Sequence, residues 1–124
     1  MALDDIMKDK YYLADTIVNA LNHELDALNL STREKFQEDL YFSIDLTLEG
    51  VRMKNANIIY RYYAWLFKHF LANNIKESLF FAMYDNILNT FKPYLKNDEY
   101  SFIRDINIHE VVSQIKETKS HITN

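Results

Sequence analysis

Histidines are the residues of this chain best suited to metal, haem or proton chemistry, and it has four of them: His23, His69, His109 and His121. An imidazole titrates near neutral pH and can ligate a metal or haem iron. His109 falls on an apolar helical stripe and His69 stands among aromatic residues, so these two are the candidate ligand contacts. The ordinary alternatives are a half-buried structural histidine for His109 and a helix-edge residue for His69. The sequence contains no His-x-x-x-His or Glu-x-x-His pair, so we predict no metal site.

Carboxylates gather in the segment 38–49, where Asp45 and Glu49 stand four residues apart and share one side of a helix. Such a pair can bind a cation or move a proton. The commoner alternative is a solvated helix face, with Arg52 or Lys54 near enough to screen both charges. The chain has no cysteine and one glycine, which argues against thiol nucleophiles, thiolate metal sites and glycine-rich phosphate loops. We therefore predict that the chain is not an enzyme and has no cofactor.

Aromatic side chains are the second group of residues that bears on function. The chain has nine tyrosines, eight phenylalanines and one tryptophan, many of them between Tyr60 and Phe91. Each buried tyrosine hydroxyl needs a hydrogen-bond partner, so nine exceed what a small core accommodates, and Tyr and Trp are frequent at protein interfaces. We predict that the rings left over once each helix has filled a single core stripe contact a partner protein: Tyr60, Tyr63, Trp65, Phe67, Phe81 and Tyr84.

Charge and hydropathy argue against two classes of partner. The net charge is −4 and both signs are mixed along the chain, whereas non-specific nucleic-acid binding needs a basic face. The acidic start is not typical of a signal peptide. The longest apolar stretch, Tyr62 to Ala72, is interrupted by Lys68 and His69 and is too short to span a bilayer. We expect a cytoplasmic protein with neither a nucleic acid nor a membrane as partner.

The periodicity of apolar residues predicts the elements that position these side chains. Residues 1–124 make one domain with an ordered core from about residue 10 to residue 117. Apolar residues recur at three- and four-residue spacing in five segments joined by short connections, which predicts an all-α, four- to five-helix antiparallel bundle. The expected helices are Lys10–Leu28, Ser31–Val51, Asn55–Ala72, Asn74–Tyr94 and Asp98–Ile115.

Helix ends are indicated by capping patterns. Ser31 with Glu34 forms an S-x-x-E capping box at the start of the second helix, and Asn74 with Glu77 repeats that spacing at the start of the fourth. Gly50 is predicted to end the second helix in a left-handed conformation. Pro93 is predicted to kink or end the fourth helix because it has no backbone N–H.

The stretch from Glu38 to Gly50, followed by Ile59 to Leu66, resembles a small helical module of bacterial regulatory proteins. That module is found ahead of cobalamin-binding-type, phosphatase or other signalling domains. Phe42 matches the phenylalanine of its pattern, and Tyr63 and Trp65 fall near its tyrosine and tryptophan. The family often has a histidine where this chain has Ser43.

The back half, from Phe70 to Ile115, is similar to the helical dimerisation modules of the RsbU N-terminal and KaiA C-terminal type. Together the two resemblances imply a regulatory module of bacterial signal transduction that forms a homodimer and docks a partner protein. The alternative is a small-molecule or tetrapyrrole sensor of the haem or cobalamin type, with an aromatic pocket contacted by His109 or His69.

Overall fold

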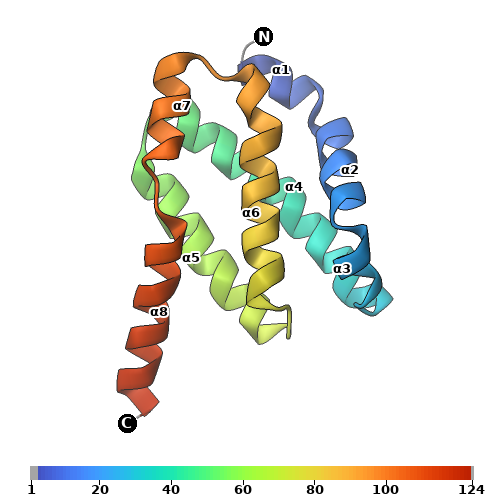
Figure 1. Ribbon diagram of the computed structural model, residues 1–124, viewed down its shortest axis with the longest axis vertical. Helices are drawn as coiled ribbons and strands as arrows, with labels where there is room; N and C mark the ends of the chain where they lie inside the picture. The colour runs from blue at the N-terminus through green and yellow to red at the C-terminus, as the bar shows by residue number, and fades with distance from the viewer. Residues whose placement is uncertain (1–2, 124) are drawn as a thin grey trace.

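The computed structural model describes the backbone of residues 3–123 and the side chains of residues 3–118, and the chain is all-α. Every element in this part of the chain is a helix (Figure 1). The α-helices are α1 (Leu3–Lys8), α2 (Lys10–Ala20), α3 (Asn22–Asp26), α4 (Leu30–Met53), α5 (Ala56–Ala72), α6 (Glu77–Phe91), α7 (Asn97–Arg104) and α8 (Ile108–Thr123), and the 3₁₀ turn η1 (Lys92–Tyr94) follows α6.

The consecutive long helices α4 and α5 pack against each other and form the rear layer in Figure 1. Helix α6 crosses in front of them. Helix α2 packs against both α4 and α6 on one side, while α8 packs against α5 on the other. The core therefore lies between α6 and the α4–α5 layer, and α6 leaves the opposite side of that layer uncovered.

Aromatic rings from α5 and α6 fill the middle of the core. Phe80 stands at the centre, with ring centroids 5.3 Å from Phe67, 5.8 Å from Phe70 and 6.2 Å from Tyr63, each in an edge-to-face arrangement. This is the geometry that aromatic quadrupoles favour. Phe36 of α4 extends the cluster to Phe70, at 5.9 Å. The aromatic richness of α5 and α6 is thus used first to build the core.

Helix α4 begins and ends differently from the sequence prediction. Its N-cap is Asn29, whose Oδ1 accepts a 2.8 Å hydrogen bond from the Thr32 N–H, so the predicted Ser31 capping box is wrong. Gly50 is buried inside the helix and is not a left-handed cap, because the left-handed residue is Lys54, with φ 48°. The absence of a side chain at Gly50 lets Ile59 of α5 approach the α4 backbone.

The prediction for α5 was accurate, since Asn55 caps it and it ends at Ala72. Pro93 lies just after α6, in η1, where it ends the α-helix as expected. Asn74 does not cap α6: it takes a left-handed φ of 60°, and the helix begins three residues later.

Two expected helices are each divided in the structure. The first is broken at Leu21 between α2 and α3, although Leu21 itself stays buried. The last is broken between α7 and α8, where the Asn107 side chain accepts a hydrogen bond from the Glu110 N–H and so caps α8. A further helix, α1, precedes the predicted core, and its Ile6 is fully buried. The packed part of the chain therefore begins before residue 10.

Candidate functional site

Large apolar side chains are exposed on the side of α4 and α5 that faces away from α6. Phe42 of α4 is 61% exposed and Trp65 of α5 is 53% exposed. Met53, near the end of α4, is also exposed, and three half-buried apolar side chains lie between these residues. We define the α4–α5 outer face by these six residues, three from each helix: Phe42, Leu46, Met53, Ile58, Tyr62 and Trp65.

Helical spacing and direct contacts place these residues on one surface. On α4, Phe42 and Leu46 are four residues apart, and on α5, Ile58 and Tyr62 have the same spacing, so each pair shares a side of its helix. The Tyr62 ring lies 5.9 Å from Trp65. The Tyr62 hydroxyl reaches across to α4, where it lies 2.7 Å from the Ser43 Oγ. Phe42 and Trp65 therefore lie on adjacent helices at a similar height.

A row of polar contacts joins α4 to α5 beneath this surface. Ser43 Oγ donates a 2.6 Å hydrogen bond to the Asp39 carbonyl, and the Tyr62 hydroxyl lies close to both groups. Deeper in the core, Thr47 Oγ1 and the Tyr63 hydroxyl are 2.6 Å apart. Burial raises the pKa of both tyrosine hydroxyls above their ordinary value, so both stay protonated and neutral. These contacts fix the two helices relative to each other.

His69 belongs to the same region and sits between a carboxylate and an indole. Its Nε2 lies 3.3 Å from Asp39 Oδ2, and its ring stacks on Trp65 with centroids 4.9 Å apart. Desolvation raises the pKa of the Asp39 carboxyl, while a charge on His69 acts in the opposite direction. The contact orients the imidazole and, through stacking, supports the exposed Trp65 ring.

The structure divides the six predicted contact residues. Trp65 is exposed, and Tyr60 and Phe81 are half-buried against the core. Tyr63, Phe67 and Tyr84 are buried in the core, so the expectation that these three rings are left over is wrong. The physical reason is that α6 covers that side of α5, where Tyr63 and Tyr84 pack edge to face at 4.8 Å.

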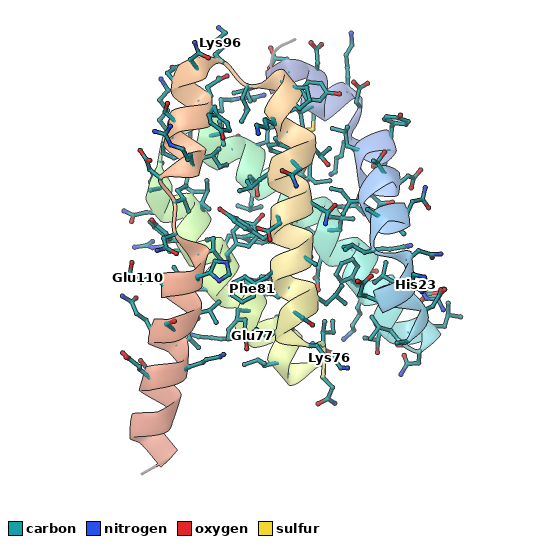
Figure 2. The ribbon with its side chains drawn as sticks, viewed as in Figure 1. His23, Lys76, Glu77, Phe81, Lys96 and Glu110 are labelled. Carbon is teal, nitrogen blue, oxygen red and sulfur yellow. The ribbon has the colours of Figure 1, made fainter. Side chains whose placement is uncertain are left out.

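The candidate ligand histidine His109 is also placed differently from the expectation. It is exposed on α8, and its ring stacks on Phe81 at 4.1 Å, so it is not a half-buried core residue. Figure 2 shows Phe81 on the side of α6 nearest α8. His109 thus contributes to helix packing at the surface.

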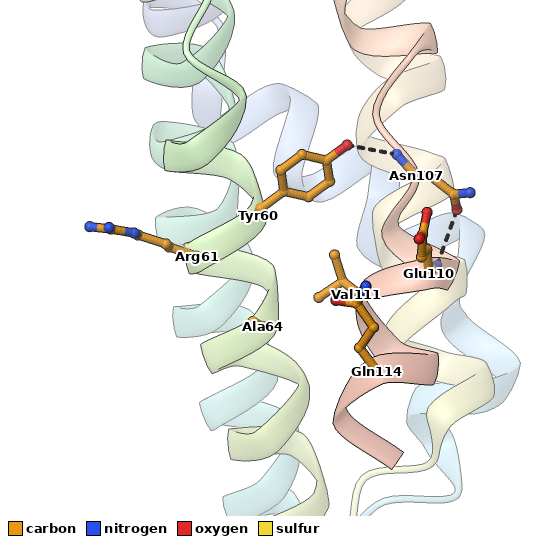
Figure 3. Close-up of a pocket in the computed structure, with 7 residues that line it drawn as sticks. All are labelled: Tyr60, Arg61, Ala64, Asn107, Glu110, Val111 and Gln114. Carbon is orange, nitrogen blue, oxygen red and sulfur yellow. Dashed lines mark hydrogen bonds between the residues drawn. The ribbon is translucent and has the colours of Figure 1, made fainter. Parts of the chain in front are cut away.

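A groove of about 410 Å³ lies between α5 and α8 (Figure 3). The Tyr60 hydroxyl closes one end by accepting a 3.4 Å hydrogen bond from the Asn107 N–H. Neither His69 nor His109 lines the groove, and the Arg61 side chain points away from it. Tyr60 is the one aromatic residue among those that line it, whereas a tetrapyrrole sensor was expected to have an aromatic pocket. The lining residues are Tyr60, Arg61, Ala64, Asn107, Glu110, Val111 and Gln114.

No group of three or more histidines and carboxylates is arranged to hold a metal ion within the described part of the chain. Asp45 of the acidic segment forms an ion pair with Lys10, whose Nζ lies 2.8 Å from Asp45 Oδ2. Among the described helices, none has the length and apolar character needed to cross a bilayer.

Phe42 and Met53 are surface residues that the reasoning about site residues missed. The buried stripe of α4 runs through Phe36, Leu40, Ile44 and Leu48. Phe42 lies about 200° around the helix from Leu40, so the sequence itself places it off that stripe. This displacement from the core stripe is the sequence feature from which the exposure of Phe42 could have been predicted.

Comparison with known proteins gives no independent assignment. Neither family models, nor curated proteins, nor solved structures include a match to this chain.

Proposed function

We propose that this chain is a non-catalytic regulatory module that binds a partner protein through the α4–α5 outer face. The observation that carries the proposal is the exposure of Phe42 and Trp65, each more than half exposed on adjacent helices. Large apolar side chains exposed together on one face are costly in water and mark sites where a protein meets a partner. Aromatic anchors surrounded by polar residues are also the usual energetic centre of such interfaces.

The support under the face suits this role. The polar contacts that join Asp39 and Ser43 to residues of α5 hold the two helices in one arrangement. A rigid platform loses little conformational entropy on binding, so more of the contact energy appears as affinity. The role in bacterial signalling rests on the sequence resemblance alone, and the half-buried Tyr60 and Phe81 lie against α8, away from the proposed face.

Site-specific photo-cross-linking in cells tests the proposal. A benzophenone-bearing amino acid is placed at position 42 of the full chain and, as a control, at Tyr12, which is even more exposed but lies on α2. We expect covalent protein adducts on irradiation from position 42 and far fewer from position 12. Equal yields from the two positions, or no adduct from position 42, would count against the α4–α5 outer face as a docking surface.

A further inference from the structure

We infer that the partner of the α4–α5 outer face is a second copy of this chain, held in a symmetric dimer whose twofold axis runs parallel to α4 and α5. The inference rests on the proposed function, because it names the partner of that surface. It starts from four charged residues that border the face: Glu38 and Glu49 on α4, and Arg61 and Lys68 on α5. All four are exposed, and none forms an ion pair within the described residues.

The two acidic residues lie on the α4 side of the apolar residues, and the two basic ones on the α5 side. Ser43 is the α4 residue that contacts α5. Viewed down the axis of α4, Glu38 and Glu49 are turned farther from Ser43 than Phe42 is. Around α5, Arg61 and Lys68 are similarly on the far side of Trp65. Figure 3 shows Arg61 pointing outward, away from α8. The face therefore has one acidic long edge and one basic long edge.

Contacts between α4 and α5 show which charges stand at the same height. Asp39 contacts His69, and Glu38 and Lys68 each precede one of these residues on antiparallel helices, so these two charges lie within about 3 Å of the same level. At the other end, Ile59 packs against Gly50. Glu49 is the neighbour of Gly50. Arg61 is two residues from Ile59, a rise of about 3 Å along α5. By the same alignment, Phe42 stands level with Trp65.

A twofold axis along the helices makes this pattern complementary to itself. Such an axis places α4 of one copy on α5 of the other without changing height. Glu38 then meets the second copy's Lys68, Glu49 meets its Arg61, and Phe42 meets its Trp65. An axis across the helices would instead place α4 on α4, with like charges opposed, which is unfavourable. The charge pattern thus selects both the partner and its orientation.

The size of the face sets the strength expected of the dimer. Helix α5 has 17 residues, hence a length of about 25 Å, and two adjacent helices are roughly 20 Å wide. The contact would bury on the order of 500 Å² per copy, near the lower limit for a specific interface. We therefore expect a reversible dimer with a dissociation constant in the micromolar range, which suits a regulatory contact.

Charge reversal combined with mixing provides the test. One variant carries Glu38→Lys and Glu49→Lys, and the other carries Arg61→Glu and Lys68→Glu. Sedimentation equilibrium from about 1 to about 200 µM measures association of the wild type, of each variant alone and of an equal mixture. We expect reversal to weaken self-association by roughly tenfold or more, because four attractive contacts become repulsive in each variant. The mixture should regain association, since every opposed pair is again of unlike charge.

The outcomes separate this inference from the proposed function. A wild type that stays at its monomer mass of 14.8 kDa, or a dimer that neither reversal weakens, would overturn the second copy as the partner. Adducts to other proteins from position 42 would then still support a docking role, whereas their absence would remove both proposals. Circular dichroism checks that each variant folds. If a variant does not fold, the salt dependence of wild-type self-association replaces it. Added salt must weaken the wild-type dimer if unlike charges face each other across the interface.

Discussion

The Tyr63 hydroxyl illustrates how single polar groups determine the arrangement of the core. The side chain is 1% exposed, and its hydroxyl lies 2.6 Å from Thr47 Oγ1 on the neighbouring helix. A buried hydroxyl without a partner costs far more than the net gain from one hydrogen bond. The pair therefore acts chiefly by excluding arrangements of α4 and α5 in which the two oxygens do not meet.

Replacement of Thr47 by valine removes this partner at nearly constant volume. We expect Thr47→Val to lower the free energy of unfolding by about 1–3 kcal/mol, since it leaves the Tyr63 hydroxyl unsatisfied in the core. Urea denaturation followed by circular dichroism measures the change. The double variant Thr47→Val with Tyr63→Phe removes both oxygens and should recover part of the loss. A single variant as stable as the wild type would show that this hydrogen bond is unimportant.

The sequence alone could not separate the exposed rings of α5 from the buried ones. Trp65 and Tyr63 are two residues apart on α5, and both were predicted to contact a partner. Trp65 is exposed, whereas Tyr63 is buried beneath α6 together with Phe67. Helical periodicity shows that two residues lie on different sides of a helix, but it does not show which side a later helix will cover. That depends on long-range packing.

At the scale of elements, the close approach of α4 and α5 depends on Gly50. A Cβ atom at this position would overlap the buried Ile59 side chain, so the glycine is required for packing and not for a turn. Because glycine is otherwise unfavourable inside a helix, its presence here implies that the helix contact repays that cost. The contact also sets the relative height of α4 and α5, on which the alignment of Phe42 with Trp65 depends.

Gly50→Ala is expected to destabilise the protein although alanine is the better helix former. The propensity gain of about 1 kcal/mol should be outweighed by an overpacking cost of about 1–3 kcal/mol, since Ile59 is fully buried and branched. Thermal and urea denaturation measure the net loss. Glu34→Ala, at an exposed position of the same helix, is the matched control and should change stability little. An alanine variant more stable than the wild type would contradict this packing role.

The boundaries of α5 could be predicted from the sequence because Asn55 is a strong cap and apolar residues recur at helical spacing from Ile59 to Phe70. The breaks between α2 and α3 and between α7 and α8 were not predicted, because buried residues continue at helical spacing on both sides of each break. A signal for the second break was present, since Asn107 and Glu110 have the same Asn-x-x-Glu spacing that was considered at Asn74. At Asn74 this spacing does not produce a cap, so the pattern alone does not decide.

At the scale of the whole molecule, the helical spacing of apolar residues predicted an all-α domain, and a composition with one glycine and one proline agrees with it. The location of the exposed aromatic face required the arrangement of all the helices, since it is the side of α4 and α5 that α6 leaves uncovered. The two charged edges can be recognised only in the folded molecule. In the sequence Glu38 and Glu49 belong to an acidic segment, but on the folded molecule they oppose Arg61 and Lys68 across an apolar surface.

Fluorescence of Trp65 gives the most direct test of the central claim, that a second copy covers the α4–α5 outer face. Trp65 is the single tryptophan of the chain and is 53% exposed in the monomer, so its emission reports on this surface alone. Acrylamide quenching is measured from about 1 to about 200 µM protein, the range in which a micromolar dimer forms. We predict that quenching falls and emission shifts to shorter wavelength as concentration rises, because the second copy shields the Trp65 ring from water. Quenching and emission that stay constant over the whole range would contradict it.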